Sequence, residues 1–255
     1  MYPYLFEGTP YQFNSWSAAF VVGLIISLTW GLIARPKDFP YTRLQMFLAV
    51  VCMFFFGFIG SRILFIALYW EGIKASGDSL IGAFIKGGNA SLGGLAVIFI
   101  VIFAFTKLRR KKVSFLVATD YALPFIALHT GIARIGCFLA GCCVGRPTDL
   151  PWGCRFLTFP NETRHPTQLY LTFSLLFVFF TARYVYKKKY PPGITSFYAL
   201  GMYALLRYFV EQLRIDSVAV WGAVTLSQLT MLSIFLFCIF MLLIILLRSN
   251  KHNTA

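Results

Sequence analysis

The sequence is poor in charged residues, and above all in acidic ones. Only 13% of the 255 residues are charged, with 9 Asp and Glu against 23 Lys and Arg. Soluble domains usually carry about a quarter charged residues. This scarcity excludes an ordinary soluble globule, a disordered tail and a coiled coil. No convincing internal repeat, low-complexity tract or long linker divides the sequence, so we expect a single domain over residues 1–255.

Apolar and aromatic side chains take the place of the missing charge. Hydrophobic residues make up 58% of the sequence, aromatic residues 18%, and the mean hydropathy is +0.73. Seven stretches approach the roughly 20 residues that cross about 30 Å of hydrocarbon, although polar residues interrupt two of them. They are 16–34, 44–70, 92–105, 114–139, 169–186, 194–213 and 225–247. The sequence predicts an all-α, polytopic integral membrane protein with seven transmembrane helices.

The basic residues predict the orientation of these helices. The first sixteen residues contain no Lys or Arg, which argues against a cleavable signal peptide. If the first connection is cytoplasmic, most of the 23 basic residues fall in inside segments, around 35–43, 107–112, 183–189 and 248–251. The positive-inside rule then places the N-terminus outside and the C-terminus in the cytoplasm. The net charge of +14 therefore reflects topology and contact with anionic lipid, and no nucleic-acid partner is expected.

Three arginines interrupt the apolar stretches. At about 1.5 Å of rise per residue, Arg62, Arg134 and Arg207 lie about 27, 30 and 20 Å above the inner surface. Gly93 and Gly94 begin their span in the same outer half of the membrane. A charge at mid-bilayer costs about 3 kcal/mol or more and usually faces a cavity or a partner. These residues indicate a polar site near the outer surface.

One face of the stretch 194–213 adds further polar groups. Tyr203, Arg207 and Glu211 follow one another at intervals of four residues, and Arg214 comes three residues later on the same face. An ion pair between Arg207 and Glu211 that serves only helix packing is one interpretation. The other is an anion site, because a guanidinium donates two charge-assisted hydrogen bonds to a phosphate. Phospholipid head groups are the anions that the outer leaflet offers.

Two further stretches carry a family resemblance. They read GIARIGCFLAGCCVGR at 131–146 and RHPTQLY at 164–170, and an outside cap loop of about 142–166 joins them. Together with the glycine pair at 93–94, Asp120 and the polar face described above, the sequence resembles the bacterial prolipoprotein diacylglyceryl transferase family. The resemblance runs in order over roughly residues 15–247. It implies a multi-pass enzyme of the bacterial cytoplasmic (inner) membrane that needs no metal or organic cofactor.

The resemblance also implies a reaction. The diacylglyceryl group of phosphatidylglycerol, or of a similar anionic phospholipid, would move to the lipobox cysteine thiol of a preprolipoprotein, with release of glycerol phosphate. Catalytic roles fall to Arg134 and Arg207, which would bind the phosphate, and to their supporting residues Tyr203 and Glu211. The expected substrate-binding residues are Arg62, Gly93, Gly94, Arg146, His165, Gln168, Tyr170 and Arg214. Two alternatives stay open: a paralogue with a different lipid portion or acceptor, and a non-catalytic protein that binds or moves phospholipid.

The sequence departs from the family pattern at the expected base. Leu92 stands where the family usually has a histidine proposed to deprotonate the thiol. Cys137 replaces an amide of the family pattern, and Cys142 replaces a carboxylate. A thiol with a pKa near 8.5 is already a few per cent thiolate at neutral pH, so sulfur attack stays feasible. His165 is the better placed of the remaining histidines, either as a base or as a structural residue.

The cysteines allow several interpretations. Cys52 and Cys238 lie in apolar stretches and are expected to pack as small hydrophobic residues. A disulfide from Cys154 to Cys142 or Cys143 would pin the outside loop. The alternatives are free structural thiols, a lipid thioether intermediate on Cys142, and a zinc site, for which the spacing is not standard.

Overall fold

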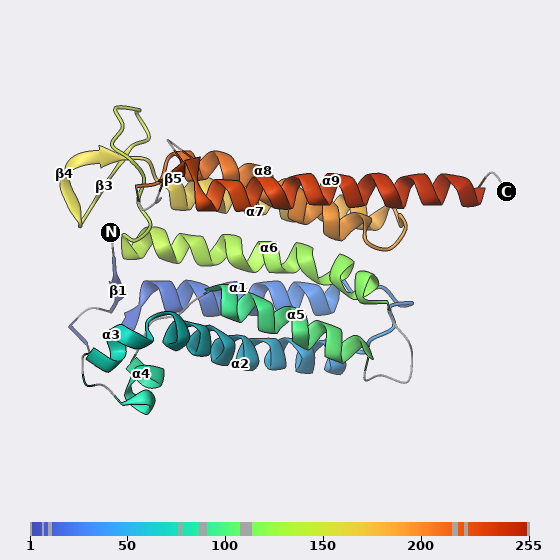
Figure 1. The fold of residues 1–255 in the computed structure, drawn as a ribbon, viewed down its shortest axis with the longest axis horizontal. Helices are drawn as coiled ribbons and strands as arrows, with labels where there is room; N and C mark the ends of the chain where they lie inside the picture. The colour runs from blue at the N-terminus through green and yellow to red at the C-terminus, as the bar shows by residue number, and fades with distance from the viewer. Residues whose placement is uncertain are drawn as a thin grey trace. The chain divides into compact units, whose positions relative to one another are not determined.

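The protein, described here by a computed structural model, consists mainly of helices. The structure describes residues 2–253 except 7, 10–11, 76, 78, 87–90, 108–113, 216–218 and 222–223; the side chains of 85–86, 91–92, 95, 105, 219–221 and 250–253 are not described. A helix forms at each of the seven positions predicted from apolar runs (Figure 1). These helices are α1 (Ser15–Ile33), α2 (Arg43–Leu68), α5 (Ser91–Lys107), α6 (Phe115–Ala140), α7 (Thr167–Lys187), α8 (Ile194–Gln212) and α9 (Leu226–Asn253).

Five of the described helices are long and apolar enough to cross a membrane. They are α1, α2, α6, α7 and the part Leu226–Ser249 of α9. Helix α5 is shorter, with 17 residues, and α8 contains both Arg207 and Glu211. The structure is therefore that of a polytopic membrane protein. The full number of seven spans and the orientation of the termini stay predictions.

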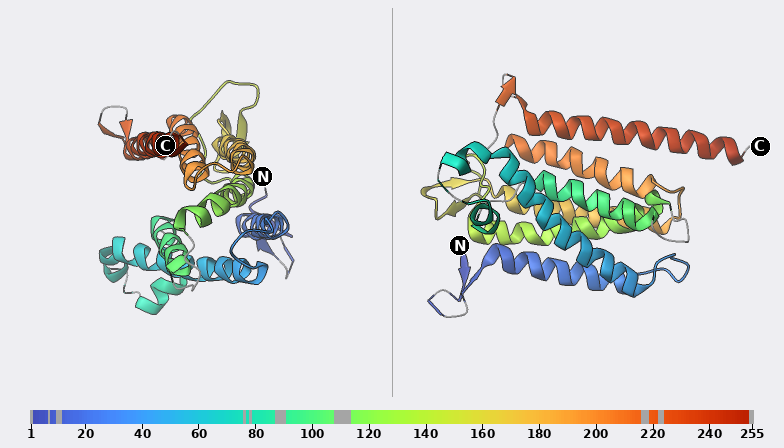
Figure 2. Two further views of the ribbon diagram at one scale, coloured as in Figure 1. Left: turned by 90° about the vertical axis from the view of Figure 1, so that its right-hand side faces the viewer. Right: turned by 60° about the horizontal axis from the view of Figure 1, so that its bottom comes forward.

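The chain divides into two compact units. Unit 1 comprises Met1–Gly31 and Thr119–Ala255, and unit 2 comprises Leu32–Ala118. Within unit 1, α8 packs against both α7 and α9, and α8 and α9 lie side by side in the end-on view (Figure 2). Within unit 2, α2 packs along α5 (Figure 1). The single domain expected over residues 1–255 stays a prediction.

Unit 2 is built around a close crossing of α2 and α5 at glycines. A Cβ atom on Gly60 would come within 2.8 Å of the Gly93 carbonyl oxygen, and one on Gly93 would overlap the Gly60 oxygen. A Cβ atom on Gly94 would lie 3.0 Å from the Gly57 oxygen. Small residues allow this close approach of two membrane helices. Helix packing thus accounts for the glycine pair at 93–94, and its contact with substrate stays a prediction.

Helix α1 also turns small residues towards its neighbours in unit 1. Its buried residues are Ser15, Gly23, Ser27 and Gly31. A Cβ atom on Gly23 would come within 3.0 Å of the His129 carbonyl oxygen on α6, and the Tyr121 hydroxyl of α6 donates a hydrogen bond to the Gly31 carbonyl oxygen. These contacts place the first turns of α1 beside the end of α6, where Gly136 packs against Ala19.

Asp120 joins the start of α6 to the start of α8. Its carboxylate accepts hydrogen bonds from the backbone N–H groups of Gly193 and Ser196, both at 2.7 Å, and from the Ser196 hydroxyl at 2.5 Å. The first N–H groups of a helix have no partner within the helix, so a side-chain acceptor stabilises the end. Asp120 is only 6% exposed and therefore acts as a buried cap of α8.

Short elements lie between the long helices. Two-stranded antiparallel sheets form from β1 (Tyr4–Leu5) with β2 (Phe13–Asn14), from β3 (Cys154–Phe156) with β4 (Phe159–Arg164), and from β5 (Ala219–Trp221) with β6 (Val224–Thr225). Helices α3 (Trp70–Ala75) and α4 (Leu80–Lys86) connect α2 to α5. The all-helical prediction missed these strands because segments of two to six residues leave no clear periodic pattern.

Candidate functional site

The predicted cap loop is a folded structure at one end of unit 1. Its two limbs pair through the backbone, where Gly145 N donates to His165 O at 3.1 Å and Thr148 N donates to Thr163 O at 2.9 Å. Arg146 N donates to the Leu213 carbonyl oxygen at 2.8 Å, so the loop is also tied to the end of α8. The β3–β4 hairpin extends from these paired limbs (Figure 1).

The first turn of α7 holds the backbone that leaves α6. Gln168 has no exposed surface, and its Nε2 donates to the Cys142 carbonyl oxygen at 2.5 Å. Thr167 Oγ1 donates to the Cys143 carbonyl oxygen at 2.7 Å. Gln168 therefore positions the main chain, and its contact with substrate stays a prediction. Sequence reasoning missed Thr167, because a hydrogen bond to a distant backbone atom leaves no sequence pattern.

His165 and Tyr170 belong to a polar group at the mouth of α7. The Tyr170 hydroxyl accepts a hydrogen bond from Trp152 Nε1 at 2.8 Å and lies 3.1 Å from His165 Nδ1. Trp152 is exposed and the other two side chains are partly exposed. These bonds join the loop to α7. They match the interpretation of His165 as a structural residue. Roles of His165 and Tyr170 in substrate contact stay predictions.

The loop arginines have different surroundings. Arg164 is buried, pairs with Glu162 and donates from Nη1 to the Gly145 carbonyl oxygen at 3.1 Å. Its guanidinium carbon also lies 3.7 Å from the centre of the Phe159 ring. Arg146 has an exposed side chain. Arg164 therefore stabilises the loop, and Arg146 is the accessible one of the two for the predicted substrate contact.

Three arginines meet where α6 and α8 end. Arg207 Nη2 lies 2.6 Å from Glu211 Oε2, so the ion pair expected from their spacing is present. Arg214 Nε lies 3.8 Å from the same oxygen. Arg134, in the last two turns of α6, and Arg214 both lie close enough to Arg207 for charge repulsion, and Tyr203 lies close enough for an electrostatic interaction. We call these five residues the arginine cluster.

The arginine cluster has a surplus of positive charge, with three guanidiniums and one carboxylate. Arg207 Nη1 is buried and has no hydrogen-bond partner among the described residues. Leaving a buried donor unpaired costs about 1–3 kcal/mol. Both features suit an anion, and phosphate oxygens match the planar donors of a guanidinium. The cluster therefore has the chemistry of a phosphate site.

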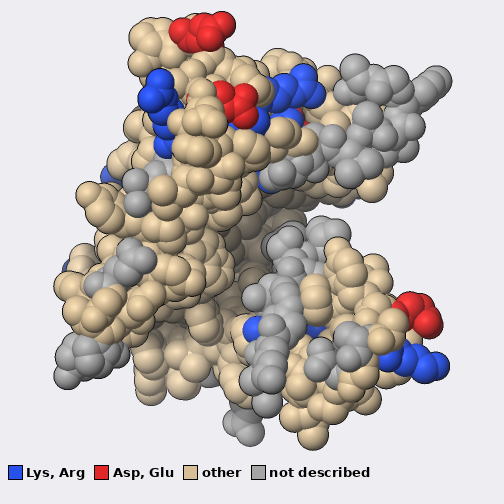
Figure 3. Space-filling model, turned by 90° about the vertical axis from the view of Figure 1, so that its left-hand side faces the viewer, with Lys and Arg blue, Asp and Glu red and all other residues tan. Residues whose placement is uncertain are grey.

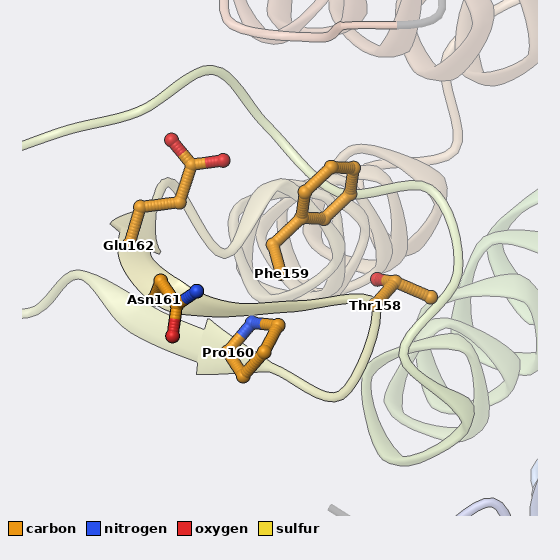
Figure 4. A pocket seen from close by; sticks show the side chains of 5 residues that line it. All are labelled: Thr158, Phe159, Pro160, Asn161 and Glu162. Atoms are coloured by element: carbon orange, nitrogen blue, oxygen red, sulfur yellow. The ribbon is translucent and has the colours of Figure 1, made fainter.

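The hairpin end of unit 1 is an alternative location for a site. Figure 3 looks onto this end, where Lys and Arg atoms occur beside Asp and Glu atoms with uncharged surface around them. An open hollow on the hairpin is lined by Thr158, Phe159, Pro160, Asn161 and Glu162 (Figure 4). One short stretch of chain supplies the whole lining. The arginine cluster, which combines residues of two helices, is therefore the stronger candidate.

Arg62, Gly93 and Gly94 belong to unit 2. The guanidinium carbon of Arg62 lies 5.2 Å from the centre of the Phe58 ring on the same helix, which is a cation–π distance. The side chain of Leu92 lies outside the described residues. The contacts of Arg62 and the two glycines with substrate stay predictions.

The cysteines that the sequence places outside are free thiols in the structure. All six cysteines are unpaired, so the structure does not contain a disulfide from Cys154 to Cys142 or Cys143. Cys154 Sγ instead donates to the Trp152 carbonyl oxygen at 3.6 Å. The Cys142 thiol donates to the Cys137 carbonyl oxygen at 3.6 Å, and the side chains of Cys137, Cys142 and Cys143 lie close enough to interact; we call them the thiol group. The described residues contain no set of three or more His, Cys, Asp or Glu arranged to hold a metal ion.

The thiol group adjoins the arginine cluster, and this changes its ionisation. Hydrogen bonds from Cys137 and Cys142 lower the pKa of Cys143 well below its ordinary value, and the charges of Arg214 and Arg134 add to this effect. Hydrogen bonds to Cys137 and Cys143 raise the pKa of Cys142. Of the two loop thiols, Cys143 is thus the one whose pKa these surroundings lower. Sequence reasoning treated the cysteines and the arginines separately and missed this contact.

Comparisons with known proteins agree on one family. The family model described as prolipoprotein diacylglyceryl transferase matches residues 3–246. The chain is similar to the phosphatidylglycerol–prolipoprotein diacylglyceryl transferase of Finegoldia magna, with 34% identity over 178 residues, 69% of this chain and 68% of that protein. The proteins of the same name from Clostridium tetani and Pseudomonas savastanoi pv. phaseolicola are 31% and 28% identical. Their matches cover 85% and 91% of this chain, and 86% and 89% of those proteins.

Proposed function

Because the chain belongs to the prolipoprotein diacylglyceryl transferase family, and is thus a transferase, we propose that it moves the diacylglyceryl group of phosphatidylglycerol to the lipobox cysteine of a preprolipoprotein. Glycerol phosphate is the second product. The names of the relatives support the two substrates. The arginine cluster supports the chemistry, and it is the structural observation that carries the proposal.

The reaction exchanges one bond for another at a glycerol carbon. The acceptor thiolate forms a carbon–sulfur bond while the carbon–oxygen bond to the phosphate breaks. The electron pair of the broken bond leaves with the phosphate, which gains negative charge during the step. Guanidiniums aimed at this phosphate stabilise the transition state more strongly than they stabilise the bound lipid before reaction. This difference accelerates the reaction.

Each member of the cluster has a role in this proposal. Arg134 and Arg207 bind the phosphate, and the buried Nη1 of Arg207 supplies a donor that none of the described residues uses. Tyr203 donates its hydroxyl to a phosphate oxygen. Glu211 lies between Arg207 and Arg214 and fixes the direction of both guanidiniums.

The remaining residues predicted to bind substrate would contact the lipid or the acceptor around the arginine cluster. Proposed contacts are Arg62, Gly93, Gly94, Arg146, His165, Gln168, Tyr170 and Arg214. We further propose a single domain with seven helices across the bacterial inner membrane, the N-terminus outside and the C-terminus in the cytoplasm. The five apolar helices support this topology. A family match that runs through both units supports the single domain.

The direct test is transfer by the purified protein in nanodiscs that contain phosphatidylglycerol, with a lipobox peptide as acceptor. Release of glycerol phosphate and the thioether mass on the peptide are measured together. Arg207→Ala is expected to lower turnover about 10²–10³-fold. Arg155→Ala, which removes an exposed arginine of β3, serves as the control and is expected to leave turnover unchanged.

The wild-type protein also decides between the alternatives. Lipid binding without any covalent product would refute the transferase reaction in favour of a lipid-binding protein. Loss of a different lipid-modified product from cells that lack the protein, with lipoproteins unchanged, would refute the lipoprotein acceptor in favour of the paralogue. A peptide with Ser in place of the lipobox cysteine is the acceptor control.

A further inference from the structure

Arg183 lies near the end of α7 that is opposite the arginine cluster. It comes four residues before Lys187, the last residue of the helix, so about 6 Å of helix rise separates the two. Helix α6 begins at this same end of unit 1 (Figure 1). In the proposed topology, Arg183 therefore lies close to the phospholipid head groups of the cytoplasmic leaflet.

Three aromatic rings surround the Arg183 guanidinium. Its central carbon lies 5.0 Å from the centre of the Phe125 ring and 5.8 Å from that of Tyr121, two buried residues of α6. The ring of Tyr186, on α7 itself, lies 5.3 Å away. All three are cation–π distances. Rings from two helices thus hold the guanidinium in one place.

These rings leave the hydrogen-bonding capacity of Arg183 unused. Its Nη1 is buried and has no hydrogen-bond partner among the described residues. Asp120, the acidic residue in this part of α6, is already bonded to the start of α8. The planar donors of a guanidinium match the oxygens of a phosphate, and the Arg183 side chain is partly exposed. It can therefore bind an anion from outside the protein.

Lysines extend the positive charge at this end of α7. Lys187 follows Arg183 by four residues and lies on the same side of the helix. Lys188 and Lys189 come next, and all three lysines are exposed. Lys188 Nζ lies 5.0 Å from the centre of the Tyr184 ring, so its side chain is held against the helix. This group of cations attracts an anionic head group and repels the ammonium group of a zwitterionic one.

Exposed aromatic residues continue from the lysines along α7. Four of them follow one another at intervals of three or four residues, and therefore share one face of the helix. They are Phe173, Phe177, Phe180 and Tyr184. Each is more than half exposed. A free phosphate ion would contact the cations alone, whereas the acyl chains of a phospholipid would also cover this apolar face.

We propose that Arg183 and Lys187 bind the phosphate of a phospholipid with net negative charge, whose acyl chains lie along the exposed aromatic face of α7. The leaflet follows from the proposed topology, whereas the contacts of Arg183 do not depend on it. This lipid is not a substrate, because the arginine cluster lies at the other end of α6. Its phosphate supplies the missing partner of the buried donor and so stabilises the contact between α6 and α7.

The first experiment locates the lipid on the unaltered protein. Phosphatidylglycerol with a diazirine near the head-group end of one acyl chain is added to phosphatidylcholine nanodiscs without acceptor peptide. Labelled peptides are identified by mass spectrometry after irradiation. We expect residues 177–187 to be labelled about tenfold more than by phosphatidylcholine with the same diazirine, and inorganic phosphate should not compete.

Two results of this experiment would overturn the proposal. Equal labelling by the two lipids would mean that α7 makes only unspecific contact with lipid. Loss of labelling in the presence of inorganic phosphate would mean that the ligand is a soluble phosphate.

The second experiment removes the guanidinium. Arg183→Ala should weaken the labelling of residues 177–187 about tenfold, because charge-assisted hydrogen bonds to the phosphate are lost. Arg183→Lys keeps the charge without the planar donors and should show a smaller loss. Arg248→Ala, which removes an exposed arginine near the end of α9, is the matched control and should label like the wild type. An equal loss in Arg248→Ala would refute a defined site in favour of general surface charge.

The comparison of the two lipids on the wild-type protein decides the question if Arg183→Ala does not fold. Failure of this site is also distinct from failure of the transferase reaction. Arg207→Ala alters the arginine cluster and should keep the selective labelling of residues 177–187. A protein that transfers lipid but is labelled equally by both lipids would lack this site alone.

Discussion

Glu211 allows a quantitative test of how the arginine cluster is held. Its side chain is 6% exposed, and its Oε2 lies 2.6 Å from Arg207 Nη2 and 3.8 Å from Arg214 Nε. Glu211→Gln keeps the shape of the side chain and removes its charge, which leaves two guanidiniums without their counter-ion. Breaking a buried ion pair in this way typically costs about 3–5 kcal/mol. We expect the free energy of unfolding to fall by this amount.

Glu162 provides the matched control. It forms the same type of ion pair, with Arg164, but its side chain is 41% exposed. Exposed pairs contribute about 0–1 kcal/mol, because water and salt screen the charges and the side chains are mobile. Glu162→Gln should therefore cost several times less than Glu211→Gln. The free energy of unfolding is measured by chemical denaturation in mixed micelles, with phosphatidylglycerol absent.

Transfer kinetics on the same two variants separate stability from catalysis. In Glu211→Gln the extra positive charge should favour the anionic lipid and lower KM, whereas kcat should fall because Arg207 is no longer oriented. Glu162→Gln should leave both constants unchanged. Equal and small losses of stability in the two variants, together with an unchanged kcat for Glu211→Gln, would refute the idea that Glu211 positions Arg207.

Two further variants probe the helix crossing and the thiol group. Gly93→Ala should lower the free energy of unfolding by about 1–3 kcal/mol, because its methyl group overlaps the facing helix, whereas Gly72→Ala, with open space around it, should be neutral or stabilising in the same denaturation assay. Arg214→Gln removes a positive charge beside Cys143, so the pKa of Cys143 rises and its alkylation by iodoacetamide moves to higher pH. An unshifted alkylation profile would contradict this charge interaction.

Local patterns were sufficient to predict the long helices. The apolar stretch 194–213 matches α8 to within one residue at its end, and 169–186 matches α7 to within two residues at its start. The interval of four residues between Arg207 and Glu211 likewise predicted an ion pair that is present. In each case the information lies in residues that are neighbours on one helix, so periodicity and composition reveal it.

Contacts between distant segments could not be predicted in this way. Gln168 binds the carbonyl of Cys142, 26 residues away, and Asp120 caps a helix whose Gly193 N–H is 73 residues away. Such bonds depend on how helices assemble, and many side chains can make them to a backbone atom. The thiol group and its neighbouring arginines are of the same kind, because residues of α6 and of the end of α8 meet only after the helices have packed.

The buried face of α1 consists of small residues, and this limits how the sequence of the helix can change. Its buried residues are Ser15, Gly23, Ser27 and Gly31, whereas bulky residues such as Ile25 and Trp30 are exposed. A soluble protein tolerates polar exchange outside and resists loss of bulk inside. Here the expected pattern is reversed: the outer positions can drift among large apolar residues, and the inner positions admit little beyond Gly, Ala and Ser. Evolution of this helix is thus constrained by the distance between helix axes more than by the hydrophobicity of its interior.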